Sequence, residues 1–265
     1  NNTAVGYQAG LSNTTGGNIT AIGRQALLYN TTGNSSTAVG LNALWSNTTG
    51  SNNTGIGEQA LVNNTTASNN TAVGYQAAYS ATTASDITAV GWKAGYSATG
   101  TASTYIGSYA GQTTTGIYNT FLGHTSGYLV TSGTKNTIIG RYNGNQGGLD
   151  IRTASNNIVL SDGDGNPRMF YKTATVNWNL EVPAASNNAL IVHNTAGSSP
   201  YGIQIDHDVD INNGSNHFID AVGGSTSRFK VFTNGNVVNT NNSYGAVSDV
   251  KLKENIADAT SQWDD

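Results

Sequence analysis

The sequence contains no cysteine, only three prolines and unusually few charged residues, and each scarcity excludes a class of protein. Charged residues make up 10% of the 265 residues. Without cysteine, neither a disulfide framework nor a thiolate metal site can form. With a net charge of −4 and no basic stripe, the chain lacks the electrostatic footprint of a nucleic-acid binder. No run approaches the roughly 20 apolar residues that span a bilayer, so we do not expect membrane insertion.

Large hydrophobic residues are also scarce. Hydrophobic residues are 37% of the chain and many of them are alanine, whereas glycine occurs 33 times. This composition is typical of a repetitive β protein rather than of an average enzyme. The sequence starts at Asn1 inside a repeat and its single methionine is Met169. We therefore expect a piece of a longer protein, in which no signal peptide can be identified.

A 17-residue repeat fills the first half of the sequence. Its clearest motif is threonine, a small residue, a β-branched aliphatic residue and glycine. Six copies in one register begin at Thr3, Thr20, Thr37, Thr54, Thr71 and Thr88, and three looser copies contain Tyr105, Phe121 and Ile138. Self-similarity at a short fixed period indicates a solenoid, whose units bury surface only against their neighbours.

The repeat unit favours strands and turns over helix. It is too short for a strand plus a helix, and it combines glycine and β-branched residues with a turn-forming run, Asn-Thr-Thr-Gly, at residues 13–16, 30–33 and 47–50. We predict an all-β fold in which residues 1–150 form a parallel β-roll or β-helix of about nine coils, each of 16 or 17 residues.

Each position of the repeat, followed through its successive copies, forms a column, and the columns differ in the kind of side chain that they carry. We expect an aliphatic column and an alanine column to point inward, and the mixed column after the glycine to face solvent, with the glycine itself at a corner where a Cβ would clash. An aspartate at Val39 should then be severely destabilising. The aliphatic column is Val5, Ile22, Val39, Ile56, Val73, Val90, Ile106, Leu122 and Ile139. The alanine column is Ala9, Ala26, Ala43, Ala60, Ala77, Ala94 and Ala110; the mixed column is Tyr7, Arg24, Leu41, Glu58, Tyr75 and Trp92.

These columns make a thin core for an isolated solenoid. A second bulky column should be covered by neighbouring coils or neighbouring chains; it comprises Leu11, Leu28, Trp45, Val62, Tyr79 and Tyr96. Because further burial has to come from outside the single chain, we predict a homotrimer, a cyclic assembly that suits an elongated β fibre.

The run from Thr3 to Gly10, Thr-Ala-Val-Gly-Tyr-Gln-Ala-Gly, resembles repeats of phage tail fibres. The 17-residue repeats as a whole are similar to the head repeats of trimeric autotransporter adhesins. The resemblance covers about residues 1–145. It implies a left-handed parallel β-roll that associates as an intertwined homotrimer.

The second half of the sequence is more charged and consists of short apolar runs between turn clusters. We expect strands near residues 158–160, 168–171, 176–182, 189–192, 202–205, 218–222 and 228–232. These strands are again sparse for an independent monomer, so residues 151–247 are predicted to form a β-rich trimeric shaft or tip. The runs 156–171 and 227–245 resemble segments of phage tail fibres that precede a C-terminal maturation domain.

The sequence from Ser248 to Ile256 resembles the start of the intramolecular chaperone domain of endosialidases, tail spikes and tail fibres, and matches every defined position of that motif. The resemblance implies self-cleavage between Ser248 and Asp249 after trimer folding, with Ser248 and Lys253 as the dyad. Ser248 cannot readily attack its own carbonyl, so attack from a neighbouring chain or activation of water is the more credible route. The alternative, compatible role for Ser248 is to cap a helix over residues 251–259. Residues 248–265 form this third segment.

Other candidate sites are weaker. The run 162–166 has the opening spacing of a calcium loop and also suits a hairpin turn, and Asp206, Asp208 and Asp210 would share one face of a strand as candidate metal ligands or as a solvated face. The histidines His124, His193, His207 and His217 lack ligand spacing. Tyr7, Tyr75 and Trp92 could stack on sugars or on each other. We expect no cofactor.

These features favour a structural and host-recognition protein of a phage tail fibre, located in the virion and extracellular when mature. Its expected partners are two further copies of itself, a cell-surface glycan or protein of the host, and other tail proteins. Apart from single-turnover self-cleavage we expect no enzyme activity. The alternatives are a bacterial trimeric surface adhesin and a polysaccharide-degrading tail spike, the latter requiring paired carboxylates across a groove.

Overall fold

The structure, a computed structural model, describes residues 1–173, 177–180, 217–223, 226–232 and 237–239. All regular structure in these residues is β, and they include no helix. The chain divides into two compact units, Asn1–Leu190 and Ile191–Asp265. Each unit is described by itself.

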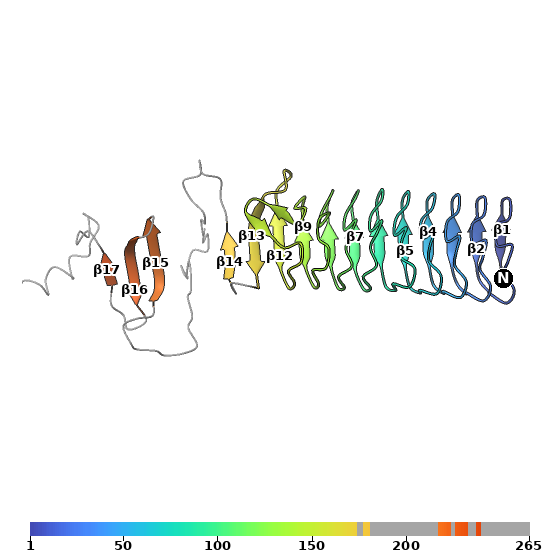
Figure 1. Cartoon of the computed structure of the whole chain (residues 1–265), viewed down its shortest axis with the longest axis horizontal. Coiled ribbons are helices and arrows are strands. Elements are labelled where there is room, and N and C mark those ends of the chain that lie inside the picture. The colour runs from blue at the N-terminus through green and yellow to red at the C-terminus, as the bar shows by residue number, and fades with distance from the viewer. Residues whose placement is uncertain (174–176, 181–216, 224–225, 233–236, 240–265) are drawn as a thin grey trace, which may run out of the picture. The chain divides into compact units, whose positions relative to one another are not determined.

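The first unit is a solenoid with one three-residue strand in each coil (Figure 1). Every strand pairs in parallel with the strand of the next coil, and equivalent residues of the repeat lie opposite one another, as Thr37 does opposite Thr54. The strands are β1 (Thr3–Val5), β2 (Thr20–Ile22), β3 (Thr37–Val39), β4 (Thr54–Ile56), β5 (Thr71–Val73), β6 (Thr88–Val90), β7 (Thr104–Ile106), β8 (Thr120–Leu122) and β9 (Thr137–Ile139). This confirms the predicted parallel solenoid of about nine coils. We number each coil after its strand.

The sheet continues past the ninth coil. β12 (Ile158–Ser161) pairs in parallel with β9, after which β13 (Pro167–Lys172) and β14 (Asn177–Leu180) add antiparallel strands. A two-stranded ribbon, β10 (Asn145–Gln146) with β11 (Leu149–Asp150), branches from the ninth coil. The compact unit that holds the repeats therefore runs beyond residue 150, into residues that we assigned from sequence to the second segment.

The second unit contains one described antiparallel sheet. It consists of β15 (His217–Gly223), β16 (Thr226–Phe232) and β17 (Val237–Asn239), in that order. β15 and β16 coincide with the strands expected near 218–222 and 228–232. Of the other expected strands, 158–160 and 168–171 lie in β12 and β13.

The interior of each coil is lined by the middle residue of the strand, and this corrects the sequence interpretation. Ala21, Ala38 and Ala72 are fully buried, whereas Ile22 and Ile56 are each 38% exposed and Val39 is half-buried. Successive side chains of a strand point to opposite faces, so the inward alanine forces its aliphatic neighbour outward. The aliphatic column therefore does not point inward, and the severe effect that we expected for aspartate at Val39 belongs to Ala38 instead.

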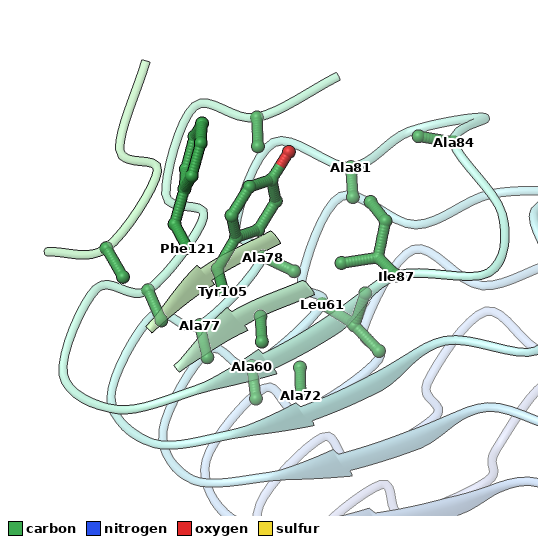
Figure 2. Close-up of a cluster of buried hydrophobic side chains, with 14 of the residues drawn as sticks. Ala60, Leu61, Ala72, Ala77, Ala78, Ala81, Ala84, Ile87, Tyr105 and Phe121 are labelled. Atoms are coloured by element: carbon green, nitrogen blue, oxygen red, sulfur yellow. The ribbon is translucent and has the colours of Figure 1, made fainter. Parts of the chain in front are cut away.

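Side-chain volumes are matched across the coil interior (Figure 2). In coils two to four, whose strands supply alanine or glycine to the interior, the opposite side is filled by the fully buried Leu27, Leu44 and Leu61. Where the strand supplies Tyr105 or Phe121, the opposite residues shrink to glycine: a Cβ on Gly111 would overlap the Tyr105 ring, and one on Gly127 would overlap Phe121. Interiors packed to native density tolerate bulk only where space is released nearby.

The alanine column and the mixed column lie as predicted. Ala26, Ala43 and Ala60 are fully buried, and Tyr7, Arg24, Leu41 and Glu58 are exposed. The second bulky column is covered unevenly: Leu28 and Val62 are buried and Trp45, Tyr79 and Tyr96 are half-buried, but Leu11 in the first coil is 62% exposed.

The repeated glycine after each strand is required by both conformation and space. Gly40 has a φ of +132°, and a Cβ on it would lie 2.6 Å from the carbonyl oxygen of Gly57 in the next coil. L-residues rarely adopt this φ, and such a contact is shorter than any real Cβ makes. The predicted corner is confirmed.

Buried asparagines hold neighbouring coils together. Asn30, Asn47 and Asn64 are fully buried, and each donates from Nδ2 to the Oδ1 of the asparagine one coil earlier, at 2.7 to 2.8 Å. Each also donates to a backbone carbonyl three residues ahead. The Asn-Thr-Thr-Gly runs thus form turns whose first residue turns inward and pairs with its copies.

Candidate functional site

Two groups of candidate residues lie outside the described residues. They are Ser248 and Lys253 of the proposed cleavage dyad, and Asp206, Asp208 and Asp210 of the weak metal candidate. The structure therefore gives no geometry for either group. Among the residues that the structure does describe, no three histidine, aspartate or glutamate side chains gather as a metal site would require.

The run 162–166 forms a hairpin turn between β12 and β13. The Asp162 carboxylate accepts hydrogen bonds from the backbone N–H groups of Asp164 and Asn166, at 3.0 and 2.9 Å, and pairs with the Arg168 guanidinium. Desolvation raises the pKa of Asp162, but the hydrogen bonds from Asn166 and Arg168 outweigh it and lower the pKa to about 2. Both carboxylate oxygens are thus engaged in holding the turn and its flanking strand.

The outward residues of the sheet form one continuous apolar stripe. We call it the aliphatic stripe; it comprises Val5, Ile22, Val39, Ile56, Val73, Val90, Ile106, Leu122, Ile139 and Leu160. The parallel register places each of these residues beside its copy in the next coil, about 4.8 Å away. Seven of them are exposed by 36% or more, and the other three are half-buried.

The strands that carry the aliphatic stripe are uncharged from β1 to β9. The first residue of every strand from β1 to β9 is threonine, and none of these nine strands contains a charged residue. Soluble proteins usually interrupt such surfaces with lysine or other charged residues to prevent association. The sheet face of this solenoid therefore has the composition of a contact surface.

A second surface feature is a group of aromatic residues, which lie in the segments after the corner glycines of coils five to eight. We call it the aromatic cluster: Tyr75, Tyr79, Trp92, Tyr96, Tyr109 and Tyr128. The rings of Tyr75 and Trp92 are stacked, with an interplanar angle of 15° and centroids 6.2 Å apart, and Tyr109 meets Trp92 edge-on at 4.5 Å. Tyr79 and Tyr96 stack at 4.9 Å. Trp92 is 44% and Tyr75 36% exposed, so the cluster presents ring surface to solvent.

One cation lies within the aromatic cluster. Lys93 Nζ is 4.9 Å from the ring centroid of Trp92, 5.2 Å from that of Tyr96 and 6.0 Å from that of Tyr75, distances typical of cation–π contacts. The salt bridges found in the described part of the chain join Arg152 to Asp150 and Arg168 to Asp162, so neither involves Lys93.

No family model, curated protein or solved structure matches this chain. In the described part of the chain, no helix is long and apolar enough to span a membrane.

Sequence reasoning listed the aliphatic column of β1 to β9 and four residues of the aromatic cluster, Tyr75, Tyr79, Trp92 and Tyr96, but not Tyr109 or Tyr128 and not their arrangement. It placed the aliphatic stripe inside the coil, although strict alternation in a strand forbids burial of both Ala38 and Val39. It named Tyr75 and Trp92 but not Lys93 beside them. The available signal was the recurrence of aromatic residues at the repeat period, in the pairs Tyr75 with Trp92 and Tyr79 with Tyr96.

Proposed function

We propose that this chain is the shaft and host-recognition part of a phage tail fibre, and that it acts as a homotrimer whose chains meet along the aliphatic stripe. The observation that carries the proposal is the stripe itself, an uncharged exposed column of aliphatic residues along the whole solenoid. Burying such a column against copies of itself removes apolar surface from water at about 25 cal/mol per Å². A cyclic assembly is the arrangement that lets three identical stripes meet.

The resemblance of the repeats and of the terminal motif supports the viral assignment. The repeats give a stiff rod, which suits a protein that holds a binding surface away from a particle. Three copies of that surface would bind a cell-surface glycan or protein with avidity, because the first contact raises the effective concentration of the others. From the terminal motif we further propose that the chain matures by self-cleavage after Ser248, with the assistance of Lys253.

The trimer is tested by sedimentation velocity on the full chain. Wild type should sediment with three times the mass of one chain. Ile56→Lys places a charge in the stripe, and it should shift the protein towards monomer while the far-UV circular dichroism of the fold is retained. Leu41→Lys is the matched control, because Leu41 is 36% exposed, similar to the 38% of Ile56, but lies outside the stripe. Monomeric wild type, or equal dissociation by both variants, would contradict the proposed interface.

Host recognition is tested separately. Fluorescently labelled full chain is mixed with a panel of encapsulated and uncapsulated bacterial strains, and bound protein is measured by flow cytometry. We expect saturable binding to a subset of strains. Absence of binding to every strain, by a chain that sediments as a trimer, would contradict the recognition role and leave the assembly in place.

A further inference from the structure

We propose that the aromatic cluster binds an acidic saccharide, with sugar rings packed against the exposed parts of Tyr75 and Trp92 and a carboxylate of the saccharide paired with Lys93. The inference deepens the proposed function, on which it rests for the biological source of the ligand. It identifies the chemical class of the receptor and the coils that contact it.

The exposure and fixed orientation of the aromatic rings support a saccharide ligand. The aromatic cluster has six rings from four coils, in two groups that Lys93 connects, and its two most exposed members, Tyr75 and Trp92, lie nearly parallel, with 15° between their planes. Exposed aromatic side chains offer large contact area at a low entropic cost, since each ring has only two side-chain torsions. In this cluster the torsions are further restricted, because Tyr109 packs edge-on against Trp92 and Tyr128 packs edge-on against Tyr109. A pre-ordered, partly exposed group of aromatic rings suits contact with the apolar C–H groups of a pyranose.

The second argument is spacing. Tyr75 and Trp92 occupy the same position of consecutive coils, as do Tyr79 and Tyr96. Consecutive coils are about 4.8 Å apart, which is comparable to the length of one pyranose unit in a polysaccharide. A linear glycan lying along the solenoid axis can therefore place consecutive sugars on consecutive coils.

The third argument is charge. Arg24 and Lys93 are the only arginine or lysine residues before residue 135, and among the residues that the structure describes Lys93 has no salt-bridge partner. The nearest acidic residue in the exposed column is Glu58, two coils from Lys93, and Asp86 accepts a hydrogen bond from Asn69. A single unneutralised cation on an apolar platform favours an anionic ligand over a neutral one. Ring stacking and the cation together define an acidic sugar.

The cluster does not compete with the proposed chain-to-chain contact. The aliphatic stripe ends each strand, and the corner glycines, Gly74 and Gly91 with φ of +133°, separate it from Tyr75 and Trp92. The two surfaces are therefore distinct segments of the coil. A trimer built on the stripe would carry three copies of the cluster.

The test is isothermal titration calorimetry of the full chain with three acidic probes: tetragalacturonate, tetramannuronate and α2,8-linked tetrasialic acid. The methyl ester of each probe is titrated in parallel, because esterification removes the charge and keeps the rings. We expect at least one acid to bind and its ester to bind at least about fivefold more weakly.

The variants are drawn from the chain's own repeats, so that each residue is already tolerated at its position. Lys93→Gln introduces the residue found at the equivalent Gln76, and Trp92→Leu the residue at the equivalent Leu41. Lys93→Gln should weaken binding of the acid about fivefold without affecting the ester, and Trp92→Leu should weaken both about tenfold. Tyr118→Asn, at an exposed tyrosine outside the cluster with asparagine at the equivalent Asn69, should leave binding unchanged.

Failure of this inference is distinguishable from failure of the proposed function. Binding of no acidic probe, or equal binding by wild type and Trp92→Leu, overturns the saccharide site, even if the labelled chain still binds bacteria. Binding of the acids with the expected loss in both variants supports the site, even if no bacterial strain is recognised.

Discussion

Asn47 donates a hydrogen bond from Nδ2 to Oδ1 of Asn30 in the preceding coil, at 2.8 Å, and both side chains are fully buried. Asn47 in turn accepts a hydrogen bond from Asn64, at 2.8 Å. Removal of Asn47 therefore leaves Asn30 Oδ1 without its donor and one N–H of Asn64 without its acceptor. Buried polar groups that lose their partners are costly because water cannot replace them.

Asn47→Ala should lower the free energy of unfolding by about 2 to 4 kcal/mol, the cost of leaving one or two buried polar groups unpaired. Thermal melting at fixed protein concentration measures the loss. Thr49→Ala, at an exposed residue of the same turn, is the control and should melt within a few degrees of wild type. Equal melting of the two variants would show that the buried asparagines contribute little.

Ala38→Asp and Val39→Asp should have different effects although the residues are adjacent. Ala38 is fully buried, so an aspartate there has no partner and should prevent folding or lower the melting temperature severely. Val39 faces outward, so Val39→Asp should retain the circular dichroism of the fold and impair only trimer formation. A folded Ala38→Asp, together with an unfolded Val39→Asp, would reverse our assignment of the two faces.

Gly40→Ala should destabilise the solenoid by at least about 2 kcal/mol, because the new Cβ meets the backbone of the next coil at an unfavourable φ. The matched control is Gly17→Ala. Gly17 has no positive φ, and its new Cβ would meet no atom closer than Asn34 Oδ1 at 3.6 Å. Thermal melting should separate the two variants clearly, and similar melting temperatures would refute the corner argument.

Tyr105→Phe should make the fold less sensitive to alkali. Burial raises the pKa of Tyr105 to about 12, against smaller opposing effects of the Ser103 and Thr114 side chains. A raised pKa favours the neutral phenol in the folded state, so its contribution is complete below pH 10 and is lost as the pH rises towards 12. The hydroxyl has no hydrogen bond of standard geometry, and Phe121 occupies the equivalent position, so the variant should fold normally at pH 7.

Melting of wild type and Tyr105→Phe is compared at pH 7 and between pH 10 and 12. The wild type should lose more stability across the alkaline window. An identical loss in both proteins would assign the alkaline sensitivity to other groups.

Lys253→Ala should abolish the proposed maturation cut without preventing trimer formation, because folding precedes cleavage. Full-length protein is expressed and its fragments are separated by mass. Wild type should release a C-terminal fragment that begins at Asp249, and Ser248→Ala should stay uncut like Lys253→Ala. Release from Lys253→Ala, or a fragment with a different first residue, would show that the mechanism implied by the resemblance does not apply.

The coil period could be predicted from sequence because the repeat copies hydrogen-bonding positions as well as residue types. Thr37 and Thr54 are equivalent in the sequence and lie opposite each other in the sheet. Which residue of each strand points into the coil could not be predicted from hydrophobicity, because Val39 is more apolar than the buried Ala38. An inward side chain has to fit the narrow interior of the coil. In the coil of Ala38, the opposite Leu44 already fills that space.

The aromatic cluster could be predicted only in part. Spacing at the repeat period indicates that Tyr75 and Trp92 are neighbours, but the position of Lys93 beside the rings depends on side-chain conformation. Similarly, the pairing of Tyr105 with Gly111 becomes visible only when the strand's inward position is known.

The stacking of identical coils has a mechanical consequence. Strands run across the solenoid, and the hydrogen bonds between them point along its length, so tension between the two ends of the solenoid loads the bonds of each coil in series. The interface between two coils that is least stable then gives way first, and its opening leaves the remaining interfaces intact. Under tension, the solenoid should lengthen in discrete events, each of which releases the chain length of one coil. It can thereby absorb a sudden load without unfolding completely.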